Sequence, residues 1–101
     1  MREQQQVATF LDEHNLHTDP AYRLLDLTAE VGELAADAAK SSEYGATPDD
    51  LAVNTDELGD ALFALLALAE ELDLDAGDAL AESLAKYEHR ADTSGSIGSG
   101  E

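Results

Sequence analysis

The chain has 101 residues, of which 44% are hydrophobic, and its 23 acidic residues against 5 basic ones give a formal net charge of −18. This length and apolar content predict one folded domain with a modest core rather than a disordered chain. The absence of cysteine excludes disulfides and thiolate metal sites, and the negative charge disfavours nucleic-acid polymers and anionic membranes as partners.

We expect neither a membrane-spanning helix nor a signal peptide in this sequence. It has no apolar run of about 18 residues, the length that suggests a membrane span, and residues 1–6 lack the apolar segment of a signal peptide. We therefore expect a cytoplasmic protein. The acidic excess also fits the hypothesis of a halophilic protein, because a Debye length of about 3 Å at 1 M salt screens repulsion among surface carboxylates.

The first predicted helix covers residues 2–15. Val7, Phe10 and Leu11 recur at helical spacing and form its apolar stripe. Asn15 closes the pattern, because asparagine tolerates the left-handed conformation that commonly ends a helix. We therefore expect a short amphipathic helix at the start of the chain.

The second predicted helix begins at Asp19-Pro20, an N-cap followed by proline at the first helical position, and extends to about Lys40. Its core stripe at helical spacing comprises Leu24, Leu27, Val31, Leu34 and Ala38. A polar stripe offset by one residue comprises Asp26, Glu30, Glu33, Asp37 and Lys40. One residue is about 100° around a helix, so we expect Glu30 and Glu33 at the margin of the core, where a site between helices belongs.

A proline at position 48, preceded by threonine, marks the next helix start. Asp49 and Asp50 follow it, where acidic groups favour the positive end of the helix dipole. Two alternatives are open at this point. Either one helix is continuous to about Asp73, or a short turn at residues 48–53 precedes a main helix that starts near Thr55.

The segment at residues 61–69 is apolar on every side of a helix, with the sequence Ala-Leu-Phe-Ala-Leu-Leu-Ala-Leu-Ala. Such a helix requires burial on nearly every side. Three short neighbouring helices cover too little of it. We therefore expect a homodimer or homotetramer in which this helix is central.

The final helix is expected to start at residues 75–78, where Asp75 is the capping residue. Its inner face comprises Ala79, Leu80, Leu84 and Tyr87. Beyond Arg90 the composition becomes that of a linker, rich in serine and glycine. We therefore expect a domain at residues 1–91 and a disordered tail at residues 92–101.

Two acidic motifs stand out from this scaffold: Glu30-x-x-Glu33 on the second helix and Glu57-x-x-Asp60 on the third. A spacing of three residues places both carboxylates of each motif on one helix face. If the two helices pack side by side, four carboxylates converge, and their repulsion calls for a cation between them. Ligands that are all oxygen suit Mg²⁺ or Mn²⁺ better than zinc. The alternative interpretation is solvated helix surface, which an acidic chain has in abundance.

With the strings around them, EVGELA at residues 30–35 and DELGDAL at residues 56–62, these motifs resemble the MazG-like all-α nucleotide pyrophosphohydrolases. The resemblance covers residues 17–90 or so. It implies an all-α bundle of four to five helices. It also implies Mg²⁺-dependent hydrolysis of nucleoside triphosphates to nucleoside monophosphate and pyrophosphate, in a house-cleaning role, with Mn²⁺ as an alternative ion. The implied metal ligands are Glu30, Glu33, Glu57 and Asp60.

The same resemblance suggests further roles. Glu33 is the candidate for positioning the attacking water. Lys86 and Arg90, four residues apart on one helix face, are candidates for binding the substrate. Lys40 is a further candidate on other grounds, because it lies on the polar stripe of Glu30 and Glu33, although a cation at a helix C-terminus is favourable in any case. Two features depart from the family: Ala29 replaces the first glutamate that many members have, and aromatic residues that stack on a base are not evident. The family's basic ending is also abbreviated, because Thr93 stands where another arginine is expected. The missing aromatic residues and this short basic ending sustain one rival, a non-catalytic acidic module that binds divalent cations or a protein partner. A second rival is a phosphohydrolase on the same scaffold with another diphosphate-linked substrate.

Overall fold

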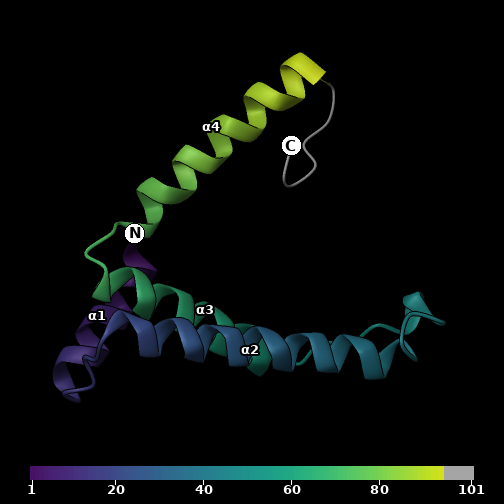
Figure 1. Cartoon of the computed structure of the whole chain (residues 1–101), viewed down its shortest axis with the longest axis horizontal. Coiled ribbons are helices and arrows are strands. Elements are labelled where there is room, and N and C mark those ends of the chain that lie inside the picture. The colour runs from purple at the N-terminus through teal and green to yellow at the C-terminus, as the bar shows by residue number, and fades with distance from the viewer. Residues whose placement is uncertain (95–101) are drawn as a thin grey trace.

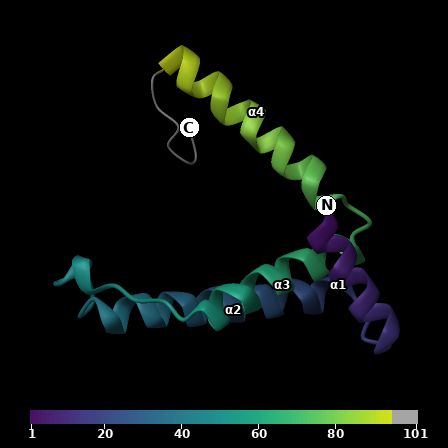
Figure 2. The same ribbon diagram turned by 180° about the vertical axis from the view of Figure 1, so that it is seen from behind.

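The computed structural model describes residues 1–94. In this range the chain forms only helices and no strand, which confirms the all-α prediction. They are, in order, α1 (Arg2–Glu13), α2 (Pro20–Ser41), the 3-10 helix η1 (Pro48–Asp50), α3 (Thr55–Glu71) and α4 (Ala76–Ser94). The antiparallel helices α2 and α3 lie side by side, α1 packs against α3, and α4 projects away from the other helices (Figures 1 and 2). None of the helices in the described range has the length and apolarity needed to cross a membrane.

Local signals set the start of α2 as the sequence predicts. The Asp19 carboxylate accepts a hydrogen bond from the Ala21 N–H at 2.9 Å, and Pro20 occupies the first helical position, where its missing N–H costs nothing. After α2 ends at Ser41, Glu43 and Tyr44 adopt positive φ angles of 51° and 56°. These residues turn the chain back toward α3.

The small core lies between α1 and α3. It is formed by Val7, Leu11, Leu66 and Ala67. Leu11 is 0% exposed, and it is the only large side chain fully buried in the described part of the chain. α1 stops at Glu13, short of its predicted end, whereas Asn15 has the predicted left-handed conformation, with φ of 53°.

Of the two alternatives for the third helix, the structure has the second. The segment after residue 47 forms the short helix η1 and an irregular stretch, and α3 then begins at Thr55. The apolar segment of α3 is buried on one side only. Its buried residues are Ala61, Ala64, Leu66 and Ala67. Leu62 and Leu65 on other faces stay about half exposed. A single chain therefore does not give α3 the burial on nearly every side that its composition predicts.

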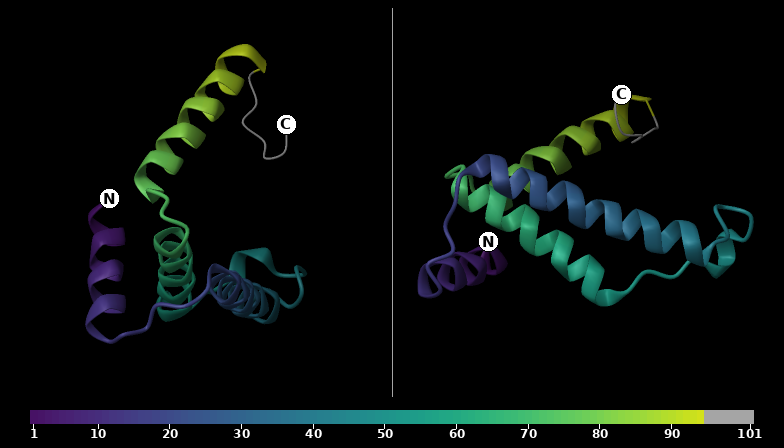
Figure 3. Two further views of the ribbon diagram at one scale, coloured as in Figure 1. Left: turned by 60° about the vertical axis from the view of Figure 1, so that its left-hand side comes forward. Right: turned by 60° about the horizontal axis from the view of Figure 1, so that its bottom comes forward.

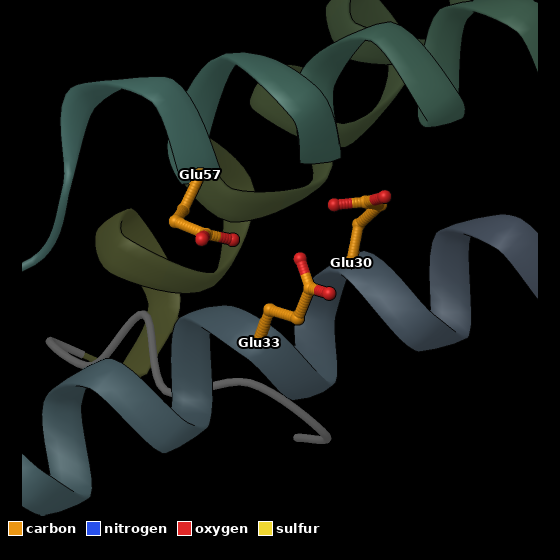
Figure 4. Close-up of side chains that lie close together, drawn as sticks. All are labelled: Glu30, Glu33 and Glu57. Atoms are coloured by element: carbon orange, nitrogen blue, oxygen red, sulfur yellow. The ribbon is translucent and has the colours of Figure 1, made fainter.

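The predicted core stripe of α2 is also incompletely covered. Leu24 is 53% exposed and Val31 is 50% exposed. The reason is that α2 packs mainly against one helix, α3, and the face of α2 that meets α3 carries Glu30 and not the whole apolar stripe (Figure 4). The periodicity identified an apolar face correctly, but the expectation that all of it forms the core is wrong for the single chain.

Helix α4 begins with the predicted cap, because the Asp75 carboxylate accepts a hydrogen bond from the Asp78 N–H at 2.9 Å. Its predicted inner face is largely exposed, with Leu80 and Leu84 in the open, since the helix leans away from the others. It continues to Ser94, so residues 92–94 are helical where a disordered tail was expected. The rest of that expected tail, residues 95–101, lies outside the described residues.

An ionic network joins the loop between α1 and α2 to the end of α3. One Glu71 oxygen accepts a hydrogen bond from the Thr18 N–H at 2.6 Å, and the other lies 2.7 Å from Nδ1 of His17. Nε2 of the same imidazole lies 2.5 Å from the Asp12 carboxylate. The buried Arg23 guanidinium lies 3.5 Å from Glu71. Two carboxylates therefore hold His17 between them.

This arrangement predicts a pH-dependent contribution to stability. Hydrogen bonds with Glu71 and then Asp12 raise the pKa of His17 above its ordinary 6.5. The imidazolium therefore stabilises the fold fully below the unfolded pKa, and this contribution is lost as the pH rises through the raised folded pKa. We expect His17→Gln to lower the free energy of unfolding more at about pH 6 than at about pH 9, as measured by urea denaturation.

His89→Gln on α4 is the matched control for this measurement, since it removes another imidazole far from the network. The loss in the free energy of unfolding that His89→Gln causes should not be larger at about pH 6 than at about pH 9. If His17→Gln destabilised the protein equally at both pH values, the contribution of a charged His17 would be disproved.

Candidate metal centre

Three glutamates from two helices converge in the seam between α2 and α3 (Figure 4). Glu30 and Glu33 extend from α2, and Glu57 extends from the first turn of α3. Each offers one carboxylate oxygen, and these oxygens lie within 4.8 Å of one another. The three-residue spacing puts the first two carboxylates on one face of α2, and the antiparallel packing brings α3 alongside that face. Three of the four predicted ligands are thus brought together.

Asp60, the fourth predicted ligand, lies beside this group and not within it. Its side chain is exposed, and the cluster found among residues 1–94 consists of the three glutamates alone. Asp60 is nevertheless close enough for like-charge repulsion to raise the pKa of both Glu30 and Glu57. The aspartate therefore lies at the margin of the seam.

The seam concentrates negative charge. Desolvation, followed by repulsion from Glu33, raises the pKa of Glu30. A hydrogen bond with Glu33, followed by desolvation and by repulsion from neighbouring carboxylates, raises the pKa of Glu57 to about 7. Such shifts mean that the site takes up positive charge readily, as a proton or as a cation.

Several buried oxygens in the seam have no hydrogen-bond partner. Within the described range they include Oε2 of Glu30, Oε2 of Glu57 and Oδ2 of Asp37. Buried polar atoms in proteins almost always have partners, and a bound cation would supply them here. A donor set made only of carboxylate oxygens suits a hard divalent ion such as Mg²⁺. The residues present therefore fit a divalent metal.

A comparison with protein families agrees with this chemistry. The family model for the MazG nucleotide pyrophosphohydrolase domain matches residues 20–94. The chain belongs to the MazG family. Its matched part includes α2 and α3 and therefore both acidic motifs of this MazG domain. No curated protein and no solved structure matches the chain.

A cavity of about 520 Å³ opens next to the acidic seam of the MazG domain. Its lining consists of Asp37, Lys40, Ser41, Ala52, Val53 and Asn54. The Ser41 hydroxyl accepts a hydrogen bond from the Ala52 N–H at 2.8 Å and lies 3.0 Å from the Ala52 carbonyl oxygen. This pairing fixes the segment before α3 against the end of α2. Lys40 lines the same cavity as Asp37, whose charge contributes to the raised pKa of Glu57.

Lys86 and Arg90 lie elsewhere. Both are on α4, which leads away from the seam between α2 and α3 (Figure 3). Nζ of Lys86 lies 5.0 Å from the ring centroid of Tyr87, and the guanidinium carbon of Arg90 lies 5.7 Å from it. The single chain therefore holds these two cations around an aromatic ring of α4 and does not bring them to the carboxylates of the seam.

The sequence predicts Asp37 to be an exposed or supporting group and not a metal ligand, whereas in the structure its Oδ2 atom is buried and its charge contributes to the raised pKa of Glu57. Asp37 is the continuation of the polar stripe, seven residues after Glu30 and therefore about two helical turns further along the same face. That spacing was the available signal. It was indistinguishable from the spacing of solvated surface acids in so acidic a chain.

Proposed function

We propose that this domain hydrolyses nucleoside triphosphates to nucleoside monophosphate and pyrophosphate, using a Mg²⁺ ion held by Glu30, Glu33, Glu57 and Asp60. The observation that carries the proposal is the convergence of three glutamates from two helices in a chain of the MazG family. A bound cation would also explain how a protein with a net charge of −18 binds a polyanionic substrate. Mn²⁺ is the alternative ion.

The positions of the side chains in the seam support the following roles. When bound, the divalent ion supplies charge neutralisation and a more acidic coordinated water. Glu30 and Glu57 are half-buried and hold the ion, with Asp60 closing the margin. Glu33 is the exposed member of the cluster, so we assign to it, besides a share in holding the ion, the positioning of the attacking water. Lys40 binds phosphate oxygens from the adjoining cavity.

We also propose that the domain works as a homodimer or homotetramer. Apolar side chains on the outer faces of α2, α3 and α4 are about half exposed, among them Leu24, Val31, Leu62, Leu65, Leu80 and Leu84. Extensive exposed apolar surface is typical of protein interfaces. Packing of α4 against a second copy is the route by which Lys86 and Arg90 would reach a substrate. A cytoplasmic house-cleaning role and adaptation to high salt complete the proposal.

The decisive experiment is a nucleotide panel with Mg²⁺ or Mn²⁺ at low and high salt. We expect at least one nucleoside triphosphate to yield monophosphate and pyrophosphate in equal amounts, and we expect EDTA to abolish the reaction. Pyrophosphate is measured by a coupled assay, and monophosphate by chromatography. Release of orthophosphate alone would contradict the proposed bond cleavage. Folded protein that binds Mn²⁺ but turns over nothing would support the non-catalytic module instead.

A further inference from the structure

We propose that a second copy of this chain docks on one face of α3, and that the two α3 helices pair antiparallel about a two-fold axis. This face, the leucine stripe, consists of Leu58, Leu62, Leu65 and Leu72. The pairing rests on the homo-oligomer of the proposed function, whose contact face it names, and it is independent of the nucleotide chemistry. Three features carry it: the spacing of the stripe, the fixed start of α4, and the surface that one chain leaves exposed.

The leucine stripe has the spacing of a coiled-coil seam. With Ala69 between the last two leucines, its members follow one another at alternating intervals of four and three residues, which keeps them on one side of a helix. The leucines are 46% to 60% exposed. No acidic residue of α3 lies on the stripe, although 28% of the chain is charged. A solvated face of so acidic a protein would carry carboxylates, so this face is suited to contact with another apolar surface.

The chain's own α4 does not fold back over the stripe, because hydrogen bonds hold its start against α1. The amide oxygen of the buried Gln4 accepts a hydrogen bond from the Ala76 N–H at 2.7 Å. The amide nitrogen of Gln4 donates to the Leu74 carbonyl oxygen and to the Glu70 carboxylate, both at 2.8 Å. From this fixed start α4 runs away from α2 and α3 (Figures 1 and 2). The stripe is therefore left to another molecule.

An apolar groove of about 340 Å³ lies where the stripe meets α4. Leu65 and Leu72 of α3 line it together with Leu80 of α4. Antiparallel pairing brings the amino-terminal half of the second copy's stripe to this groove, so that Leu58 and Leu62 of that copy fill it. The axis passes near Leu65, seven residues from either end of the stripe. The two-fold axis repeats the contact, so both grooves are filled by the same residues.

One chain exposes enough surface for such a contact. Its accessible surface is 7163 Å², whereas a compact protein of its mass, 10.7 kDa, exposes about 5,500 Å². Its radius of gyration is 16.4 Å, against about 13 Å for a compact domain of this length. The excess is more than about 1,000 Å² per copy, and two copies thus reach the roughly 2,000 Å² at which obligate homodimer interfaces begin.

Sedimentation velocity of the full chain at several concentrations tests the pairing. We expect the wild type to sediment with at least twice the chain mass of 10.7 kDa. Leu65→Glu places two like charges at the axis, so the mass should shift to that of a single chain at the same concentrations. Leu25→Glu is the matched control, because Leu25 is 65% exposed on α2 and outside the stripe. It should keep the mass of the wild type.

Cross-linking decides the case in which the Leu65→Glu chain does not fold. The chain contains no cysteine, so Leu65→Cys introduces a single thiol, which faces the same thiol of the second copy across the axis. Oxidation of the folded variant should convert most of it to a disulfide-linked dimer on a denaturing gel. Leu25→Cys, treated in the same way, should remain largely uncross-linked.

A monomeric wild type would overturn the inference and assign the stripe to a different partner. Hydrolysis of nucleotides by that monomer would leave the proposed reaction intact. An oligomer that persists in Leu65→Glu and does not cross-link through Leu65→Cys would overturn the stripe as the contact face. An oligomer that cross-links there but turns over no nucleotide would support the pairing and contradict the proposed reaction alone.

Discussion

Replacing Glu57 with glutamine should reduce the proposed nucleoside triphosphate hydrolysis by about a thousandfold, since a catalytic metal generally contributes several kcal/mol and each 1.4 kcal/mol is about tenfold in rate. Glu57 is the one member of the three-glutamate cluster that comes from α3. Glutamine preserves the shape of the side chain but removes its charge, so the cation would be held from α2 and Asp60 alone. Steady-state kinetics at saturating Mg²⁺ measures the effect.

The same variant should have the opposite effect on the stability of the metal-free protein. The pKa of Glu57 is about 7 in the folded state against an ordinary 4.5. Between these values the folded state binds more protons than the unfolded state, so the contribution of Glu57 to stability falls as the pH rises. We expect the free energy of unfolding of Glu57→Gln not to fall with pH in this way. In EDTA at about pH 8 the variant should therefore be more stable than the wild type.

Glu82→Gln on α4 provides the control for both measurements, because Glu82 is an exposed glutamate outside the seam. It should change neither turnover nor the pH dependence of unfolding. Retained activity in Glu57→Gln would defeat the ligand assignment. Lower stability of this variant in EDTA would show that the seam does not concentrate repulsive charge.

Replacing Leu11 with alanine should lower the free energy of unfolding by about 3 kcal/mol, within the range of Leu→Ala substitutions that leave a cavity. Leu11 is 0% exposed and packs with Val7, Leu66 and Ala67. The total stability of a small domain is about 5–15 kcal/mol, so this loss is a large fraction of it. With one large side chain fully buried in the described range, no neighbour compensates for the lost packing.

Urea denaturation of Leu11→Ala and Leu51→Ala tests this expectation. Leu51 is 52% exposed in the segment before α3, so its truncation should cost less than about 0.5 kcal/mol. The measurement should be repeated at several protein concentrations, because self-association would make apparent stability rise with concentration. Equal losses for the two variants would show that the packing of α1 on α3 does not dominate the stability of the single chain.

The parts of the fold that follow from local chemistry were predictable. An aspartate before a proline starts α2, an aspartate caps α4, and Asn15 takes a positive φ; each depends on a few neighbouring residues. The direction of α4 was not predictable in this way. Periodicity shows which face of a helix is apolar, but it does not show which neighbour covers that face. For the same reason the predicted core stripe of α2 was only partly buried.

In the candidate site, too, some features follow from local sequence and others depend on tertiary packing. The spacing of Glu30 and Glu33 fixes their shared face, so their convergence with Glu57 required only that α2 and α3 pack side by side. The marginal place of Asp60 and the inward place of Asp37 depend on how each helix is rotated about its axis. That rotation is set by packing along the whole seam. The spacing of carboxylates in an acidic sequence does not predict this rotation.

The antiparallel pairing of α2 and α3 has one further consequence. The two half-sites are carried by consecutive helices, so a cation bound in the seam would act as a reversible crosslink between the two arms of a hairpin. Binding at a hundred times the dissociation constant would then add about 2.7 kcal/mol to the stability of that pairing. In this small protein, the supply of divalent cation would set how tightly the hairpin stays closed as well as whether the site is complete.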